Sequence, residues 1–572
     1  MQYTALDKSN YQIRLLHLSP SSDRRSIIAC HFSVTSLLAG ARNTNYEALS
    51  YAWGEPLLDR SINLEGTHFA VTANLLSILR ALRYADQVRV LWIDAICIDQ
   101  HNVLERSHQV SRMNDIYSRA SNVIVWLGEP RSDAALAFSF LEEFGHNPSE
   151  HLTLHRTERN VEQTAMSVRS LLTRSWWTRI WTAQEWILAK SSIFQCGQHV
   201  LDGDVLFRCL DHFRRHVKSI DCCDMQLSSD FLFRIGDSLQ PALALSLVKQ
   251  SYAEQDFSYS LGFLRVRQAT DPRDKVYGIL ALAAERYAGL LKANYNLPVE
   301  QVYEQIAIAL IERTGRLDIL SHVAPNQSRN LNVPTFVPDW TVELGKEYSS
   351  DWTERFRNLY RYNACLSKAA DFEAKPGVLY IKGILTDSIV TMSPRRLGSY
   401  RKTRSYCNEI LDDMYEIAEP VEDKPYDGRY QTRKEAFWLT MCGGYETNAI
   451  DRRSHISKRR LSSYQCFESW EEWFRGSRTT YQTSDYQLRS VTDSIASVSK
   501  GRTFCITEKG LMGWIPKNCL PGDCVAVMTG GRVPIILRPH DGYYTVLGDA
   551  YIHGIMDGEA IHAGDFKYLE LR

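Results

Sequence analysis

The stretch that most constrains the fold is residues 88–129, VRVLWIDAICIDQHNVLERSHQVSRMNDIYSRASNVIVWLGE. It opens with an apolar, β-branched run that predicts a strand buried on both faces. From about Glu105, apolar residues recur every three or four positions, which is the spacing of a helix face packed on a core. Val123–Leu127 forms a second apolar run. Strand, helix and strand in succession form a unit whose two strands must run parallel.

Polar residues follow the first of these strands directly. Asp94 comes immediately after the apolar run, and Asp99 and Gln100 lie just beyond it. In an open parallel sheet, ligands bind outside the carboxyl ends of the strands, where these side chains would stand. The alternative is that Asp94 caps the strand end and pairs with Arg106 or Arg112. Both interpretations remain open, and the two acids, Gln100 and Arg106 are candidate ligand-binding residues.

Another strand is predicted at Tyr46–Gly54, YEALSYAWG. Trp53 lies at its carboxyl end, so we expect Trp53 to face the same crevice as Asp94 and to be a further ligand-binding candidate. The second informative segment is residues 168–189, VRSLLTRSWWTRIWTAQEWILA, which predicts a single helix with four tryptophans.

In one continuous helix, Trp177, Trp181 and Glu185 stand at positions i, i+4 and i+8 and therefore share a face. Burial beside two indoles would raise the pKa of this carboxyl unless Arg174 or Arg179 offset the desolvation. The alternative is that the tryptophans are core residues and the glutamate pairs with an arginine. The first interpretation makes Glu185 the candidate catalytic residue and the two tryptophans ligand-binding candidates.

Bulk composition limits the class of protein. A length of 572 residues predicts about three domains, because single cores rarely grow beyond about 250–300 residues. Lys plus Arg (66) nearly balance Asp plus Glu (67), so no nucleic-acid partner is expected. The first residues lack the apolar core of a secretory signal, and no apolar run is long enough for a membrane span. The 13 cysteines never form a C-x-x-C pair, which favours reduced thiols and a cytoplasmic location.

The rest of the chain predicts two further regions. Apolar spacing of three to four residues predicts a helical middle region over 202–370. From 371 to 572, short strands with Gly turns predict a small antiparallel β region, interrupted by a polar insertion at about 400–500. No metal site is predicted, because the metal-ligand patterns H-E-x-x-H and C-x-x-C are missing. Metal binding stays open for a group of four metal-capable residues, Cys209, His212, His216 and Cys222.

Several of these blocks resemble, in order, the motifs of the fungal heterokaryon-incompatibility (HET) domain family. They are YEALSYAWG, LWIDAICIDQ, ERSHQVSRM, IYSRASNVIVWLGE and the pattern W-x-x-R-x-W-x-x-QE that ends at Glu185. DPRDKVYGILALA, VPTFVPDW and GRVPIILRP are similar to later regions of larger members. The resemblance implies a HET domain over 1–201, with a motif core at about 46–189. It also implies an effector role in non-self recognition and incompatibility cell death.

The HET domain is similar in architecture to Toll/interleukin-receptor-type (TIR) domains, which implies an α/β domain with a flavodoxin-like parallel sheet and flanking helices. Several TIR domains cleave NAD⁺ with a glutamate, and by this similarity Glu185 is the catalytic acid and NAD⁺ a substrate. No cofactor is implied. Because fold likeness alone does not establish an activity, the alternative is a non-enzymatic signalling module. Such a module would associate with itself or with a protein partner that triggers incompatibility.

Overall fold

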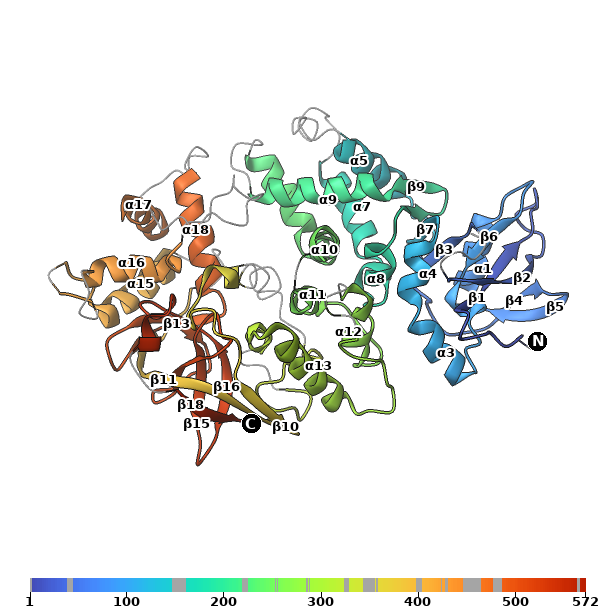
Figure 1. Cartoon of the computed structure of the whole chain (residues 1–572). Helices are drawn as coiled ribbons and strands as arrows, with labels where there is room; N and C mark the ends of the chain where they lie inside the picture. Colours follow the sequence, from blue (N-terminus) through green and yellow to red (C-terminus); the bar gives the residue numbers. More distant parts are fainter. Residues whose placement is uncertain are drawn as a thin grey trace. The chain divides into compact units, whose positions relative to one another are not determined.

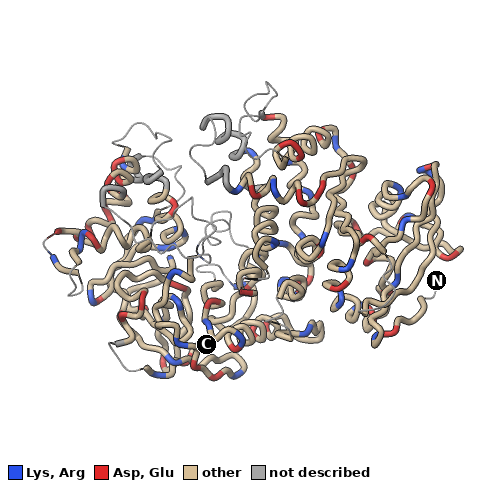
Figure 2. Tube along the Cα trace, turned by 45° about the horizontal axis from the view of Figure 1, so that its top comes forward, with Lys and Arg blue, Asp and Glu red and all other residues tan. Residues whose placement is uncertain are grey.

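The computed structural model describes the chain apart from residues 1–2, 39–44, 147–160, 219–224, 253, 255, 284–286, 288, 324–328, 343–354, 356–357, 398–403, 423, 427–430, 446–463, 477–485 and 563–565. It contains two compact units (Figure 1). The first unit comprises residues 1–217, 222–255 and 267–286, and the second comprises 218–221, 256–266 and 287–572. Figure 2 shows basic and acidic residues interspersed along both units, in keeping with the net charge of −1.

The first unit is built on a mixed sheet with the strand order β5-β4-β2-β1-β6-β3-β7-β8-β9. Its four central strands, β6, β3, β7 and β8, run parallel. The strand bounds are β1 Gln12–Leu18, β2 Ala29–Ser36, β3 Glu47–Tyr51, β4 Arg60–Leu64, β5 Thr67–Val71, β6 Arg89–Trp92, β7 Asn122–Trp126, β8 Ser192–Cys196 and β9 His199–Asp202.

The prediction of a parallel sheet is therefore correct for the centre of the sheet and for the flanking pair β2–β4, and wrong for the other flanking pairs. β6 and β7 run parallel as predicted, but β3 lies between them. β1 pairs antiparallel with both β2 and β6, β4 with β5, and β8 with β9. The connections from β1 to β2, from β4 to β5 and from β8 to β9 are short. A parallel pair needs a crossover of a dozen or more residues, so these neighbours form hairpins.

Helices flank this sheet. α1 follows a side-chain cap, since Thr72 accepts a hydrogen bond from the Leu75 amide, and it buries one apolar face. The helix bounds in this unit are α1 Ala73–Leu82, α2 Asp94–Cys97, α3 Val103–Val110, α4 Met113–Arg119, α5 Ala134–His146, α7 Val161–Leu172, α8 Thr182–Ile187, α9 Gly203–Lys218, α10 Met225–Ser251 and α12 Asp274–Tyr277.

The single helix predicted over 168–189 is wrong. α7 ends at Leu172, a short 3₁₀ helix spans Ser175–Thr178, and α8 begins only at Thr182. Between them, the Ile180 amide donates to the Gln268 carbonyl at 2.9 Å instead of to its own helix. The Arg267 side chain also binds main-chain carbonyls of this segment. These outside partners replace the helical hydrogen bonds and turn the tryptophans in different directions.

The second unit combines the remaining helices with a barrel. β11, β14, β15, β16 and β18 pair in a closed ring, to which β10, β12, β13 and β17 are added. The strand bounds are β10 Phe372–Lys375, β11 Val378–Met392, β12 Arg502–Thr507, β13 Met512–Pro516, β14 Cys524–Met528, β15 Ile535–Pro539, β16 Tyr544–Asp549, β17 Tyr551–Ile552 and β18 Lys567–Leu571. The helix bounds are α11 Phe257–Leu264, α13 Val299–Thr314, α15 Arg404–Ala418, α16 Arg433–Cys442, α17 Tyr464–Arg475 and α18 Tyr486–Ser499.

The prediction of an antiparallel C-terminal region needs correction, because β16 and β18 pair in parallel through Tyr544 and Leu571. The long connection between these strands makes this direction available. The segment predicted as a polar insertion contains α15 to α18. Phe437 and Trp470 on these helices are buried in the same core as the barrel residues Phe504 and Trp514. Their apolar positions are spaced along helices, so the average composition of the segment hides them.

Candidate active site at the carboxyl edge of the parallel strands

Trp53 and Asp94 meet at the carboxyl ends of two neighbouring parallel strands. β3 ends two residues before Trp53, and β6 ends two residues before Asp94. The Trp53 Nε1–H donates to Asp94 Oδ2 at 2.9 Å. Trp53 is 39% exposed, so its indole is open to a ligand at this edge. The structure thus brings together two of the residues that the sequence singled out.

Glu185, on α8, reaches the same part of the sheet. Its side chain is buried, and its Oε2 accepts a hydrogen bond from the Ser50 hydroxyl. Ser50 is the residue before the last one of β3. The Trp176 Nε1–H donates to the same hydroxyl oxygen at 2.7 Å. Glu185 is therefore hydrogen-bonded to the carboxyl end of β3. Its partner Ser50 lies three residues before Trp53 in the chain.

The pKa values of both acids are raised. The pKa of Glu185 is about 8, because burial and the negative charge of Asp94 raise it against the opposing hydrogen bond from Ser50. Burial also raises the pKa of Asp94, although its bond from Trp53 opposes this change. A carboxyl with a pKa near 8 is mainly protonated at neutral pH. Perturbed acids of this kind are typical of functional sites.

Two tyrosines and one arginine complete this neighbourhood. Burial raises the pKa of both Tyr51 and Tyr117 well above the usual value, and the nearby acids add to the effect. The charge of Arg179 opposes the rise at both phenols. Arg179 is half-buried, and among the described residues it forms no ion pair within 4 Å.

Sequence reasoning did not find Ser50, Tyr51 or Tyr117 as site residues. Tyr51 had a usable signal, because it lies two positions before Trp53 and would share its strand face if the strand continued. Ser50 is a hydroxyl inside an otherwise apolar strand, which is a second signal. Tyr117 lies in the segment after Glu105 that the sequence predicts to pack on a core, and its hydroxyl donates to the Leu49 carbonyl at 3.0 Å.

Trp177 lies before the break that precedes α8, which corrects the prediction that it shares one continuous helix with Trp181 and Glu185. Trp177 is buried, stacks on Phe194 and donates to the Leu171 carbonyl at 3.1 Å. Trp181 donates from its Nε1 to Asp274 at 3.0 Å. The break before α8 separates Trp177 from the helix of Glu185, and Trp176 donates to the same serine hydroxyl that binds the carboxylate.

The remaining predicted residues support the loop after β6. Gln100 donates to the main-chain carbonyl of Asp94 at 2.9 Å, and Asp99 accepts a hydrogen bond from the His101 amide at 3.1 Å. Arg106 is exposed on α3. In the described part of the chain it forms no ion pair with Asp94. The alternative partner Arg112 pairs instead with Asp115 at 3.4 Å.

A buried ion pair fixes the same loop. Arg14 on β1 binds Glu105 with an Nη2–Oε2 distance of 3.0 Å and donates to the Cys97 carbonyl at 3.1 Å. Glu105 also accepts a hydrogen bond from the Asp99 amide at 2.8 Å. The positions of Asp99 and Gln100 therefore depend on a pair from β1 and α3.

Two other cations hold α8. The Arg267 Nε donates to the Arg179 carbonyl at 2.7 Å, just before the helix. At the other end, Lys249 Nζ donates to the carbonyls of Trp186 and Ala189 at 2.9 and 3.3 Å. Positive charge is favourable at a helix carboxyl end. The helix that carries Glu185 is thus fixed at both ends by long-range contacts.

The metal-capable residues named from the sequence do not form a described site. Cys209 is buried, and His212 Nδ1 forms a hydrogen bond with the Phe144 carbonyl at 2.9 Å. The side chains of His216 and Cys222 lie outside the described residues. Across the described chain, no group of three or more His, Cys, Asp or Glu side chains could hold a metal ion. In the same residues, we find no helix with the length and apolarity of a membrane span.

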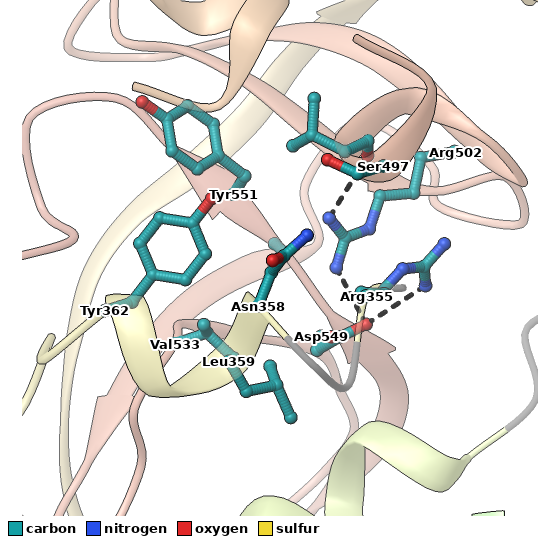
Figure 3. Close-up of a pocket in the computed structure, with 11 residues that line it drawn as sticks. Arg355, Asn358, Leu359, Tyr362, Ser497, Arg502, Val533, Asp549 and Tyr551 are labelled. Carbon is teal, nitrogen blue, oxygen red and sulfur yellow. Dashed lines mark hydrogen bonds and ion pairs between the residues drawn. The ribbon is translucent and has the colours of Figure 1, made fainter. Parts of the chain in front are cut away.

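The second unit has a small cavity of about 20 Å³ (Figure 3). Arg502 Nη2 and Arg355 Nη1 bind Asp549 Oδ1 at 2.8 and 3.4 Å. Asn358 lies between these charged groups and a tyrosine pair that includes Tyr551 (Figure 3). The volume fits about one water molecule. With its acid already paired, this cavity is a weaker candidate than the edge of the parallel strands.

Comparisons with known proteins agree with the motif order. Residues 46–185 match the family model described as heterokaryon incompatibility protein (HET), and residues 483–567 match the Het-6 beta-barrel domain. The chain is 26% identical to Heterokaryon incompatibility protein 6, OR allele, of Neurospora crassa. That alignment covers 97% of this chain and 95% of the relative. No solved structure matches.

Proposed function

Because the chain belongs to the HET-domain family of heterokaryon-incompatibility proteins, we propose that it is an effector of fungal non-self recognition whose HET domain cleaves NAD⁺. The observation that carries the catalytic part is the placement of Glu185. Its carboxyl is hydrogen-bonded to Ser50 near the end of β3, close enough to Asp94 for the charge of Asp94 to raise its pKa. Cell death would follow from depletion of the dinucleotide.

The chemistry needs few groups. Nicotinamide leaves a cationic ring as a neutral base, so its departure requires no general acid. A carboxylate near the anomeric carbon stabilises the oxocarbenium-like centre, as in glycoside hydrolysis. Glu185 supplies that carboxylate, Trp53 supplies an aromatic surface, and Asp94 accepts a hydrogen bond from a ribose hydroxyl.

The raised pKa of Glu185 sets a condition on this reaction. Without substrate, the carboxyl is mainly neutral at pH 7, because its pKa is about 8. A cationic nicotinamide ring beside it favours the ionised form and lowers this pKa. The substrate therefore helps to produce the charged group that its own cleavage requires, and turnover at low substrate rises with pH.

The test is release of nicotinamide from NAD⁺ by the full-length protein, both free and artificially clustered. We expect release by the wild type and a loss of about 100-fold or more in Glu185→Gln, since a buried electrostatic contact to the transition state is removed. Glu142→Gln, an identical change at an exposed position of α5, is the matched control and should retain activity. No release by the wild type in either state, or equal release by Glu185→Gln, would remove the enzymatic proposal.

A second candidate is a non-enzymatic module that associates with itself or with a triggering protein. It is favoured by two adjacent apolar side chains at the start of α3, Val103 and Leu104, which are 62% and 72% exposed. They follow the loop that carries Asp99 and Gln100. Adjacent exposed apolar groups favour an interaction surface. If Leu104→Asp abolished toxicity while Glu185→Gln kept it, this candidate would replace the enzyme.

A further inference from the structure

Ser50 lies between two buried partners whose chemistry fixes the direction of its proton. Trp176 Nε1 lies 2.7 Å from the Ser50 oxygen, and an indole N–H can only donate. The hydroxyl therefore accepts from the tryptophan and has its own proton left for Glu185 Oε2. Ser50 is fully buried, Trp176 is 1% exposed and Glu185 is 5% exposed, so water competes little for these bonds.

Because of these hydrogen bonds, the two carboxyl oxygens of Glu185 have different surroundings. Oε2 accepts from Ser50, whereas Oε1 accepts no hydrogen bond among the described residues. A free carboxyl could rotate and exchange its oxygens, but the bond from Ser50 stops this rotation. The unbound oxygen is the one that a reacting atom would meet.

We propose that Ser50, oriented by Trp176, is a positioning residue that holds one oxygen of Glu185 and presents the other to the substrate. Its catalytic consequence rests on the proposed function, whereas its effect on Glu185 does not. The hydrogen bonds from Trp176 to Ser50 and from Ser50 to Glu185 join the motifs YEALSYAWG and W-x-x-R-x-W-x-x-QE, which lie far apart in the sequence.

The hydrogen bond also favours the ionised carboxyl, because it is donated to the charged form. The hydrogen bond lowers the pKa of Glu185, as do the positive charges of Arg179 and Arg267. Burial and the negative charge of Asp94 on α2 raise this pKa. The phenols of Tyr51 on β3 and Tyr117 on α4 face the same acid. Of these groups, all in the described part of the chain, Ser50 alone forms a direct hydrogen bond with the Glu185 side chain.

The experiment follows the carboxyl C=O stretch of Glu185 by infrared difference spectroscopy on the full-length protein, with Glu185→Gln as the reference. In Ser50→Ala we expect the titration midpoint to move up by about one pH unit, the size of one charge-assisted hydrogen bond. Ser50→Thr keeps the hydroxyl and should restore the wild-type midpoint. Trp176→Phe keeps a ring but frees the serine proton, so it should give a smaller upward shift.

With NAD⁺, the midpoint of the rate profile should shift in the same direction in Ser50→Ala, with a fall in kcat rather than a rise in KM. An unchanged carboxyl midpoint in a folded Ser50→Ala protein would overturn the proposal, as would a Ser50→Thr midpoint equal to that of the alanine variant. If Ser50→Ala does not fold, an unchanged midpoint in Trp176→Phe overturns it equally. Absence of NAD⁺ cleavage by the wild type would defeat the proposed function alone, because the infrared titration needs no substrate.

Discussion

Two buried acids, Asp549 in the second unit and Glu185 in the first, have opposite electrostatic surroundings. In the barrel unit, Asp549 is 3% exposed and is bound by two arginines, which hold its pKa below the usual value. In the first unit, Glu185 is 5% exposed and has a hydrogen bond from a serine but, among the described residues, no ion pair. Its pKa is raised to about 8. A buried acid with its own cations belongs to the scaffold, whereas one left without them is available for a ligand.

The first unit itself also contains a buried acid that has an ion pair. Glu105 is buried like Glu185, but it forms an ion pair with Arg14, and its pKa is lowered. The difference is therefore not one of domain or of burial. Glu185 and Asp94, which form no ion pair among the described residues, lie near the carboxyl ends of β3 and β6, where a parallel sheet binds its ligands.

The largest effect that tests this contrast is on stability in the barrel unit. Asp549→Ala would leave two buried guanidinium groups without their acid, and we expect a loss of about 3–5 kcal/mol in the free energy of unfolding. Denaturant unfolding curves of the variant and the wild type give this difference in the free energy of unfolding, and calorimetry checks it. Asp371→Ala removes an exposed acid from its pair with Lys382 and should cause no measurable change. Equal stability of the two variants would show that the Asp549 pairs are not structural.

An effect that is smaller for each pH unit, and opposite in sign, is expected at Glu185. Its pKa is about 8 when folded and near 4.5 when unfolded, so between these values the folded chain keeps a proton that the unfolded chain has lost. This contribution is full below pH 4.5 and declines as the pH rises towards 8, by up to about 1.4 kcal/mol for each pH unit. Glu185→Gln lacks this titration.

The stability of Glu185→Gln relative to the wild type should therefore increase from pH 5 to pH 8. Unfolding free energies measured at each pH give this difference directly, with Glu142→Gln as the control. A constant difference across the range would mean that the carboxyl titrates normally and that the contrast with Asp549 is lost.

The smallest stability effect is expected for Trp53. Trp53→Phe removes the donor to Asp94 at a half-open position, so the unfolding free energy should change by only about 0.5 kcal/mol. The KM for NAD⁺ should rise, because the aromatic platform loses its fixed orientation. Trp181→Phe is the matched variant, since it removes an indole bond to Asp274 instead. An equal rise in KM for both variants would show that the effect is not specific to this edge.

Much of the first unit could be predicted from the sequence. The apolar runs that became β6 and β7 are long enough to specify buried strands, and Trp53 and Asp94 meet because both follow parallel strand ends. Local patterns were sufficient at these positions because the strand ends themselves determine where the residues lie.

The region before Glu185 could not be predicted in this way. Nothing local in the tryptophan-rich segment shows that Gln268 and Arg267, from a distant part of the chain, replace its helical hydrogen bonds. A continuous helix therefore placed Trp177 on the face of Glu185 and missed Trp176. Glu185 still reaches Ser50 because α8 packs on β3. The antiparallel flanks and the parallel closure of the barrel are long-range choices of the same kind.

The most direct test of the central idea is nicotinamide release from NAD⁺ at subsaturating substrate from pH 6 to pH 9, with wild type and Glu185→Gln compared at each pH. Release by the wild type should rise as the pH approaches 8, and release by the glutamine variant should stay near zero throughout. A wild-type rate independent of pH, with a comparable rate in the variant, would contradict it.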